Sequence, residues 1–315
     1  ILAAKVNNVC QGLKYRAFIS RQVEFLDYTS YAGRSVYCNS LCFLFCKAVR
    51  DLFPDGKVIL RRPISKGYFC SVDKKDGTEL TNGDLERIKG RMQEIVDADI
   101  PFRRHEVQRE EAIEMFRKLG YEDKVKLLET SADLYVNYYT LENTPDYYYE
   151  ALCSSTGYLK VWEVSMYRGG LLLRVPDRHN PEELAPFVEQ PKTFEVFSEN
   201  LKWNRIMRLD NVGDVNLACR RGEASDLIQI AEALQEKKIV QIAEEIERRV
   251  TREDNPVKIV LITGPSSSGK STFSGMSPRN ARMLCIPLSF SCAITESTFS
   301  LVDDAHVRWA IAGIP

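Results

Sequence analysis

The stretch SVYCNSLCFLFCKAVRDLFPDG, residues 35–56, predicts a long apolar helix around which the neighbouring segments can be placed. Its apolar residues recur at helical spacing, and Pro54 and Gly56 end the pattern, as these residue types commonly end helices. Three of its cysteines stand four residues apart, which would place them on one helix face: Cys38, Cys42 and Cys46. They could form a thiolate metal site, but we interpret them as reduced thiols in a protein core.

Shorter elements are expected on both sides of this helix. Before it, residues 12–30 mix short β-like runs with polar breaks, which is typical of a small sheet. After it, GDLERIKGRMQEIVDADI (83–100) predicts a second helix, with Asp84 placed to act as its N-cap.

The segment that follows alternates strands and a helix. PFRRHEVQ (101–108) predicts a strand, and REEAIEMFRKLG (109–120) predicts a helix ended by Gly120. Residues 131–175 are rich in Tyr and β-branched side chains and predict several strands. The first half of the chain is therefore expected to have an α+β fold.

The next region is expected to connect this block to a second domain. Residues 177–220 have a mixed pattern, with 177–187 as a loop leading to a short helix. Residues 224–250 predict a long, charged amphipathic helix. TREDNP (251–256) is a plausible linker before VKIVLIT (257–263), which predicts a strand.

Bulk composition excludes some classes of partner. The net charge of −1 gives no general reason to expect a polyanion, and no apolar run approaches the roughly 20 residues that a membrane span needs. The nine cysteines form no CxxC pair, which favours a reducing compartment, so we expect a cytoplasmic protein with no membrane partner.

A phosphate-loop motif, G-x-x-x-x-G-K-[ST], follows the predicted strand 257–263. Its glycines let successive N–H groups point at phosphate oxygens, and the next helix would present its positive end to the same anion. Lys270 would reach the β/γ-phosphates as the catalytic residue, and the Ser271 hydroxyl would bind Mg²⁺. The expected cofactors are therefore ATP and Mg²⁺, bound by Gly264, Pro265, Ser266, Ser267, Ser268, Gly269, Lys270, Ser271 and Thr272.

Two family resemblances refine this expectation. GPSSSGKSTFS (264–274) resembles the loop of the uridine kinase/phosphoribulokinase family of P-loop kinases. Residues 39–72, continuing through 84–116 and ending near 163, resemble the second additional domain of threonyl-tRNA synthetases. Together they are similar to bacterial nucleoside kinases with a synthetase-like N-terminal region.

These resemblances imply an α+β synthetase-like module followed by the start of an incomplete α/β P-loop NTPase domain. The implied segments are a ubiquitin-like remnant at 1–30, the synthetase-like module at 31–176, a connecting region at 177–255, and a truncated kinase domain at 256–315 with an aberrant tail from about 274. Gly275 and Pro278 would break the helix after the loop almost at once, and the tail offers no recognisable catalytic base.

The synthetase resemblance also implies a zinc site, which this sequence lacks. Asn39 and Phe43 stand where the related module has two His, and Tyr148 and Leu152 stand where it has Cys and His. Because zinc sites are built from Cys, His and carboxylates, we expect no zinc. The three histidines, His105, His179 and His306, are far apart in sequence and are interpreted as surface or structural residues.

The main functional hypothesis is an ATP-dependent, uridine-like nucleoside kinase that transfers the γ-phosphoryl group to a nucleoside and is catalytically incomplete in this chain. The alternative is an RNA- or nucleotide-binding module derived from a synthetase editing domain, without catalysis. Basic RRPISK (61–66) and ACRRGE (218–223) and the aromatic run at 135–150 could contact RNA, although surface exposure and strand packing explain them more simply.

Overall fold

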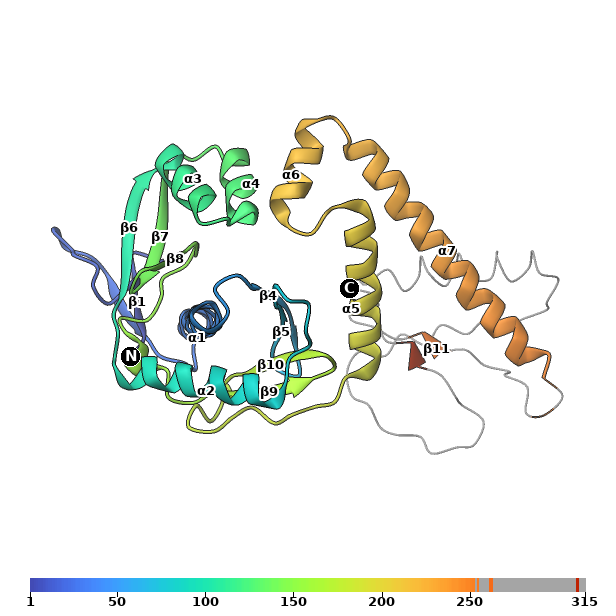
Figure 1. Ribbon diagram of the computed structural model, residues 1–315, viewed down its shortest axis with the longest axis horizontal. Coiled ribbons are helices and arrows are strands. Elements are labelled where there is room, and N and C mark those ends of the chain that lie inside the picture. The colour runs from blue at the N-terminus through green and yellow to red at the C-terminus, as the bar shows by residue number, and fades with distance from the viewer. Residues whose placement is uncertain (253, 255–260, 263–309, 312–315) are drawn as a thin grey trace. The chain divides into compact units, whose positions relative to one another are not determined.

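A computed structural model describes residues 1–252, 254, 261–262 and 310–311 (Figure 1). The chain divides into two units, Ile1–Leu217 and Ala218–Pro315. The described part has a mixed α+β structure, as the sequence predicts. The four segments expected from the sequence, and the boundaries between them, remain a prediction.

Helix α1 (Tyr31–Leu52) is the centre of the first unit. Figure 1 shows it end-on, with strands on both sides of it and α2 (Asn82–Asp97) below it in this view. From Val36 to Val49 every residue except Asn39 is buried, so the helix is buried on all faces rather than on one. The four-residue spacing of its cysteines consequently does not distinguish a special face.

Both ends of α1 are defined by local chemistry. The Ser30 hydroxyl caps the start by accepting a hydrogen bond from the Gly33 N–H at 3.1 Å. The helix ends at Leu52, just before the predicted break at Pro54 and Gly56. A Cβ on Gly33 would lie 1.8 Å from the Asp27 carbonyl oxygen, so only glycine fits this close approach.

Three antiparallel sheets surround α1. The N-terminal sheet has the order β2-β1-β3, and the second has the order β4-β5-β10-β9. The third, β6-β7-β8, begins at the predicted strand 101–108. The strand bounds are β1 Ala3–Val6, β2 Val9–Gly12, β3 Val23–Leu26, β4 Lys57–Ile64, β5 Gly67–Asp73, β6 Phe102–Gln108, β7 Tyr135–Leu141, β8 Thr144–Asp146, β9 Glu163–Tyr167 and β10 Gly170–Arg174.

The helices outside the core agree with the sequence in part. The predicted stop at Gly120 is confirmed, since α3 (Arg109–Lys118) ends just before it, and α7 (Ala224–Val250) matches its predicted bounds. The remaining bounds are α4 Glu122–Thr130, the 3₁₀ turn η1 Thr156–Tyr158, α5 Pro191–Met207 and α6 Val212–Arg220. Two short strands, β11 (Leu261–Ile262) and β12 (Ala310–Ile311), pair in parallel.

Two local predictions were wrong. Asp84 is not the N-cap of α2, because the helix begins earlier and Thr81 caps it. The Thr81 hydroxyl accepts from the Asp84 N–H at 3.2 Å, while the Asp84 carboxylate accepts from the Thr81 N–H at 3.0 Å, a capping box. The single short helix expected within 177–220 is replaced by α5 and α6; α5 starts at Pro191, a residue well suited to a first helical position.

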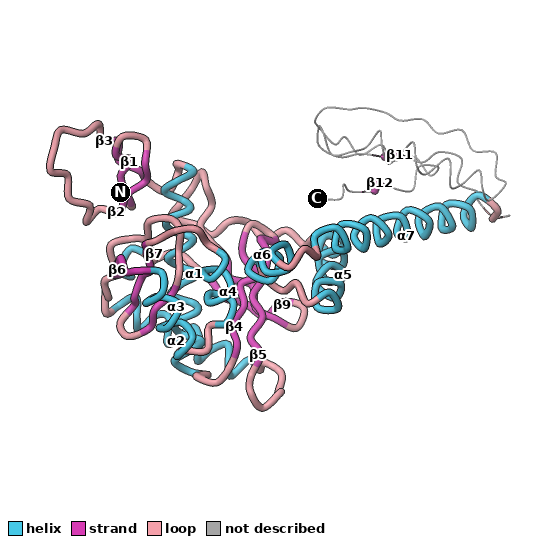
Figure 2. Tube along the Cα trace, turned by 90° about the horizontal axis from the view of Figure 1, so that it is seen from above, coloured by secondary structure: helices cyan, strands magenta, loops and turns pink. Residues whose placement is uncertain are grey.

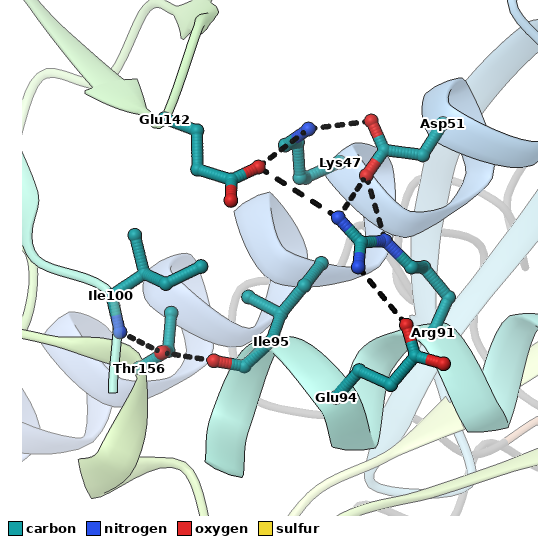
Figure 3. Close-up of polar contacts among 8 residues, drawn as sticks. All are labelled: Lys47, Asp51, Arg91, Glu94, Ile95, Ile100, Glu142 and Thr156. Atoms are coloured by element: carbon teal, nitrogen blue, oxygen red, sulfur yellow. Dashed lines mark hydrogen bonds and ion pairs between the residues drawn. The ribbon is translucent and has the colours of Figure 1, made fainter. Parts of the chain in front are cut away.

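An ion-pair network ties α1 to α2 and to the β7–β8 turn (Figure 3). The buried Lys47 ammonium lies 2.5 Å from Asp51 and 3.1 Å from Glu142. Arg91 on α2 reaches the same Asp51 at 2.9 Å and pairs with Glu94 at 3.0 Å. The network fixes how the sheet containing β7 sits against the central helix.

A buried hydroxyl fixes the chain near residue 156 (Figure 3). Thr156 Oγ1 donates to the Ile95 carbonyl at 2.7 Å and accepts from the Ile100 N–H at 2.8 Å. Because these bonds satisfy polar groups inside the core, they hold the segment just before Thr156 in one place. That segment, 152–154, forms part of the site below.

Candidate functional site

A cleft of about 450 Å³ opens in the first unit between the N-terminal sheet and the β6–β7 sheet. Four separate segments form it: the end of β2 with the loop after it, the start of β6, one residue of β7, and residues 152–154. The lining residues are Gln11, Gly12, Leu13, Lys14, Tyr15, Phe102, Arg103, Arg104, His105, Tyr139, Leu152, Cys153 and Ser154.

The polar side of the cleft is cationic. Lys14, Arg103 and Arg104 all line it, and no Asp or Glu is among the described residues of its wall. Lys14 Nζ donates to the Ser154 carbonyl at 3.4 Å, and Arg104 Nε donates to Asn137 Oδ1 at 3.1 Å. Both partners are neutral, so these contacts orient the cations and leave their charge available to an anion.

One carboxylate with an electrostatic effect from Lys14, that of Asp99, already accepts hydrogen bonds from other groups. The hydrogen bonds from Ser155 and from the Gly157 N–H hold the pKa of Asp99 below its ordinary value, and Lys14 adds a smaller effect. The Gly157 N–H donates to Asp99 Oδ1 at 2.9 Å. Asp99 therefore supports the chain beside the cleft rather than neutralising it.

The floor of the cleft is apolar and aromatic. Phe102, Tyr139 and Leu152 are buried there. Phe102 packs on Phe43 of α1, with ring centroids 5.8 Å apart. Burial raises the pKa of Tyr139, so its hydroxyl stays protonated. A cationic wall over an aromatic floor suits an anion that carries a flat ring.

The four positions where the family resemblance places zinc ligands lie beside this floor. Phe43 and Tyr148 stack at 5.5 Å between centroids, and Leu152 is buried in the cleft wall. Asn39 Nδ2 donates to Glu150 Oε2 at 3.3 Å, and Ser35 Oγ donates to the same oxygen. Apolar packing takes the place of a ligand set there.

Within the described ranges, no group of three or more His, Cys, Asp or Glu could hold a metal ion. The expectation of no zinc remains a prediction.

The buried cysteines behave as core thiols. Burial raises the pKa of Cys46 to about 12, and it also raises the pKa values of Cys38 and Cys42. All three also lie in the main apolar core cluster, which favours the core interpretation over a thiolate site.

The two described histidines lie in different surroundings, and Lys66 of the basic segment 61–66 pairs with Asp177, the residue that also accepts from the His179 N–H. His105 lines the cleft, stacks on Tyr138 at 5.0 Å and contacts Thr140 Oγ1 at 3.0 Å. His179 lies in an exposed loop. Arg61 donates to Ser71 Oγ at 3.1 Å and does not line the cleft.

The predicted phosphate loop lies outside the described residues, as does His306. The loop residues concerned are Gly264, Pro265, Ser266, Ser267, Ser268, Gly269, Lys270, Ser271 and Thr272. ATP and Mg²⁺ binding at these positions remains a prediction.

Sequence reasoning missed the cations of the cleft. PFRRHEVQ was interpreted only as a strand, and Lys14 only as part of a small sheet. One signal was available, since two adjacent arginines follow a buried Phe at the start of a strand. The partner segment is distant in sequence, because Lys14 and Ser154 are 140 positions apart.

Comparison with known proteins points to aminoacyl-tRNA ligases. The chain is 36% identical to the threonine–tRNA ligase of Desulforamulus reducens over 133 residues, which are 42% of this chain and 20% of that protein. It is 31% identical to that of Symbiobacterium thermophilum over 169 residues and 30% identical to that of Fusobacterium nucleatum over 170, each 53% of this chain. These matches span about a quarter of the relatives' length. No protein-family profile matches the chain.

These comparisons correct the main functional hypothesis. The relatives are tRNA ligases and not P-loop nucleoside kinases, so the prediction of an ATP-dependent nucleoside kinase was wrong. The comparisons give no support to a nucleoside as partner. The synthetase-like part of the resemblance is supported, and the uridine kinase part is not. The error arose because one short motif outweighed a similarity that extends over half the chain. No helix in the described part of the chain is long and apolar enough to cross a membrane.

Proposed function

We propose that the first unit is an RNA-binding module, related to part of a threonine–tRNA ligase, that binds RNA in the cationic cleft and has no zinc-dependent hydrolytic centre. The single observation that carries the proposal is the cleft itself: Lys14, Arg103 and Arg104 over a floor of Phe102 and Tyr139. The similarity to enzymes that act on tRNA supports RNA as the ligand class.

The charge pattern suits a phosphate backbone. The whole chain has a net charge of −1, so any affinity for a polyanion must come from a local cluster. Three cations without a facing carboxylate form such a cluster. Arginine guanidinium groups can donate two parallel hydrogen bonds to a phosphate, which adds direction to the attraction.

The size and the rings suit an unpaired nucleotide. A volume of about 450 Å³ falls in the usual range for small-molecule pockets and is too small for a duplex. The half-exposed Tyr15 offers a ring at the rim on which a base can stack. Recognition of unpaired nucleotides by stacking and backbone contacts is the usual mode for RNA-binding proteins.

We propose no zinc-dependent hydrolysis, because the side chains at the positions that correspond to the relatives' metal site are unsuited to bind zinc. Phe43, Tyr148 and Leu152 offer no donor set for zinc. Phe43 packs on Phe102 and on Tyr148, so apolar contacts occupy the positions at which a metal would be bound.

RNA binding by the full chain tests the proposal. Fluorescence anisotropy would measure its affinity for bulk tRNA and for a single-stranded RNA between 50 and 300 mM salt. Three phosphate contacts on a single strand predict a log–log salt slope of about −2. Arg103→Gln should weaken binding and reduce that slope by about 0.7.

The matched control is Lys75→Gln. Lys75 is 74% exposed on the loop after β5, does not line the cleft, and carries the same charge. The Lys75→Gln variant should leave the affinity for RNA and the salt slope unchanged. If Lys14→Gln combined with Arg103→Gln binds RNA as tightly as the unaltered chain, the proposed function is wrong.

A further inference from the structure

The loop between β2 and β3, residues 13–22, is drawn in Figure 2. Near its middle it carries two exposed apolar side chains. Phe18 is 87% exposed and Ile19 is 64% exposed. Neither packs in the clusters that form the core. In Figure 2 the loop extends away from the rest of the unit beside β3. An aromatic ring held in water in this way contributes no burial to stability, and its face is available to a ligand.

The loop is fixed at both ends and open at its tip. At its start the Tyr15 N–H donates to the Gly12 carbonyl at 2.9 Å. At its end the Gln22 N–H donates to Asn7 Oδ1 at 3.0 Å, and the Asn7 N–H donates to the Gln22 carbonyl at 3.0 Å. The residues between these anchors are exposed, so the ring of Phe18 is presented from a tethered position.

Cations flank the exposed ring. Arg16 and Arg21 lie on either side of Phe18 and Ile19 and are exposed, and neither is ion-paired with a described carboxylate. The base of the same loop contributes Lys14 and Tyr15 to the cleft wall. One short segment therefore carries a continuous series of cations and rings from the cleft to the loop tip.

We propose that this loop is a second contact for single-stranded RNA, in which one base stacks on Phe18 and the adjoining phosphates bind Arg16 and Arg21. The inference rests on the proposed function and deepens it. The ligand becomes a run of unpaired nucleotides longer than the cleft can hold, with one nucleotide in the cleft and a neighbour at the loop. Alternation of aromatic stacking with cations is the usual way in which proteins hold single strands without reading sequence.

An anionic membrane surface is the competing partner for exposed apolar residues beside arginines. The continuity with the cleft favours RNA, because Lys14 and Tyr15 on the same loop face a concave pocket that a flat bilayer cannot enter. The lipid alternative is therefore included as an outcome of the test.

The experiment compares ligand length. The full chain is titrated with a labelled mononucleotide and with oligouridylates of two, four and eight nucleotides. Phe18→Ala should weaken binding of the eight-nucleotide RNA by roughly 5- to 150-fold, the range expected for loss of one base–aromatic stack. It should leave the mononucleotide unchanged, whereas Arg103→Gln should weaken both.

Two further variants make the test specific. Phe18→Tyr keeps a stacking surface and should bind like the unaltered chain. Tyr31→Ala removes an 83% exposed ring that lies outside the loop and the cleft wall, and it should have no effect. Because Phe18 is outside the core, Phe18→Ala should unfold at the same temperature as the unaltered chain, which circular dichroism checks.

The outcomes separate the two proposals. If Phe18→Ala binds eight nucleotides as tightly as the unaltered chain while Arg103→Gln does not, the loop inference fails and the cleft proposal stands. If Arg103→Gln affects no ligand, the proposed function fails. Sedimentation with phosphatidylserine vesicles that requires Phe18, together with unaltered RNA affinity, would assign the loop to membranes and overturn the inference.

Discussion

The same substitution, glycine to alanine, is expected to have opposite effects at two helical positions of this chain. Gly33 stands in the first turn of α1, and Gly90 stands in the interior of α2. An alanine Cβ at position 33 would meet the Asp27 carbonyl oxygen at 1.8 Å and Ser30 Oγ at 2.8 Å. At position 90 nothing lies within 4 Å of the added carbon.

The magnitude at position 33 follows from what must move. Contacts below 3.0 Å are not tolerated by a real Cβ, so the Asp27–Ser30 turn must shift by more than 1 Å. That shift removes the cap on Gly33 and the 2.7 Å bond from Ser30 Oγ to the Asp27 carbonyl. The two lost hydrogen bonds cost about 1 kcal/mol each, and backbone strain adds a further contribution. We therefore expect Gly33→Ala to lower the free energy of unfolding by about 2–4 kcal/mol.

Gly90→Ala should stabilise the protein instead. Alanine is favoured over glycine in an exposed helix interior, so this variant should raise the free energy of unfolding by about 1 kcal/mol. Far-UV circular dichroism during heating and urea titration of the full chain would measure both. For a unit of this size the expected shifts are a melting temperature lower by about 5–15 °C for Gly33→Ala and higher by about 2–4 °C for Gly90→Ala. A Gly33→Ala protein that melts at or above the unaltered temperature would refute the reasoning.

Three other predictions concern charge, thiols and packing. The Lys74 hydrogen bond, followed by that from the Thr81 N–H, lowers the pKa of Asp84 to about 2. The stabilisation by the Asp84 carboxylate is therefore present above the unfolded pKa of about 4 and is lost as pH falls toward 2. In urea titrations, the stability difference between the unaltered chain and Asp84→Asn should shrink over that pH window. Native protein should react rapidly with a maleimide at the exposed Cys219, which mass spectrometry would show. Rapid labelling of the buried thiols would contradict their assignment to the core; these are Cys38, Cys42, Cys46, Cys70 and Cys153. Phe43→Ala should lower the free energy of unfolding by about 3–5 kcal/mol, because its fully buried ring packs between Phe102 and Tyr148; a loss below 1 kcal/mol would contradict that packing.

Elements with strong local signals were predictable from the sequence. The apolar run before Pro54, the stop at Gly120 and the charged helix at 224–250 each depend on residues close together in the chain. The cap of α2 was misassigned because Thr81 and Asp84 are both good capping residues, and only the backbone decides which one precedes the first turn.

The cleft could not be derived in the same way. Its cations come from two segments nearly 90 positions apart, around Lys14 and Arg103, and its floor requires knowledge of how β6 packs on α1. Nothing local distinguishes Arg103 from any other exposed arginine on a strand. The phosphate-loop motif shows the opposite problem, since a strong local pattern supported a function that the similarity over a much longer segment contradicts.

The burial of α1 on every side has a consequence for how the first unit opens. A helix with one solvated face can lose protection while its neighbours stay folded, but α1 is buried from Val36 to Val49 and contacts α2, β4 and β7 at once. Its amide protons can reach water only when those elements separate together. In native-state hydrogen–deuterium exchange they should therefore form the slowest class and report the global unfolding equilibrium, while the exposed residues 16–21 exchange much faster.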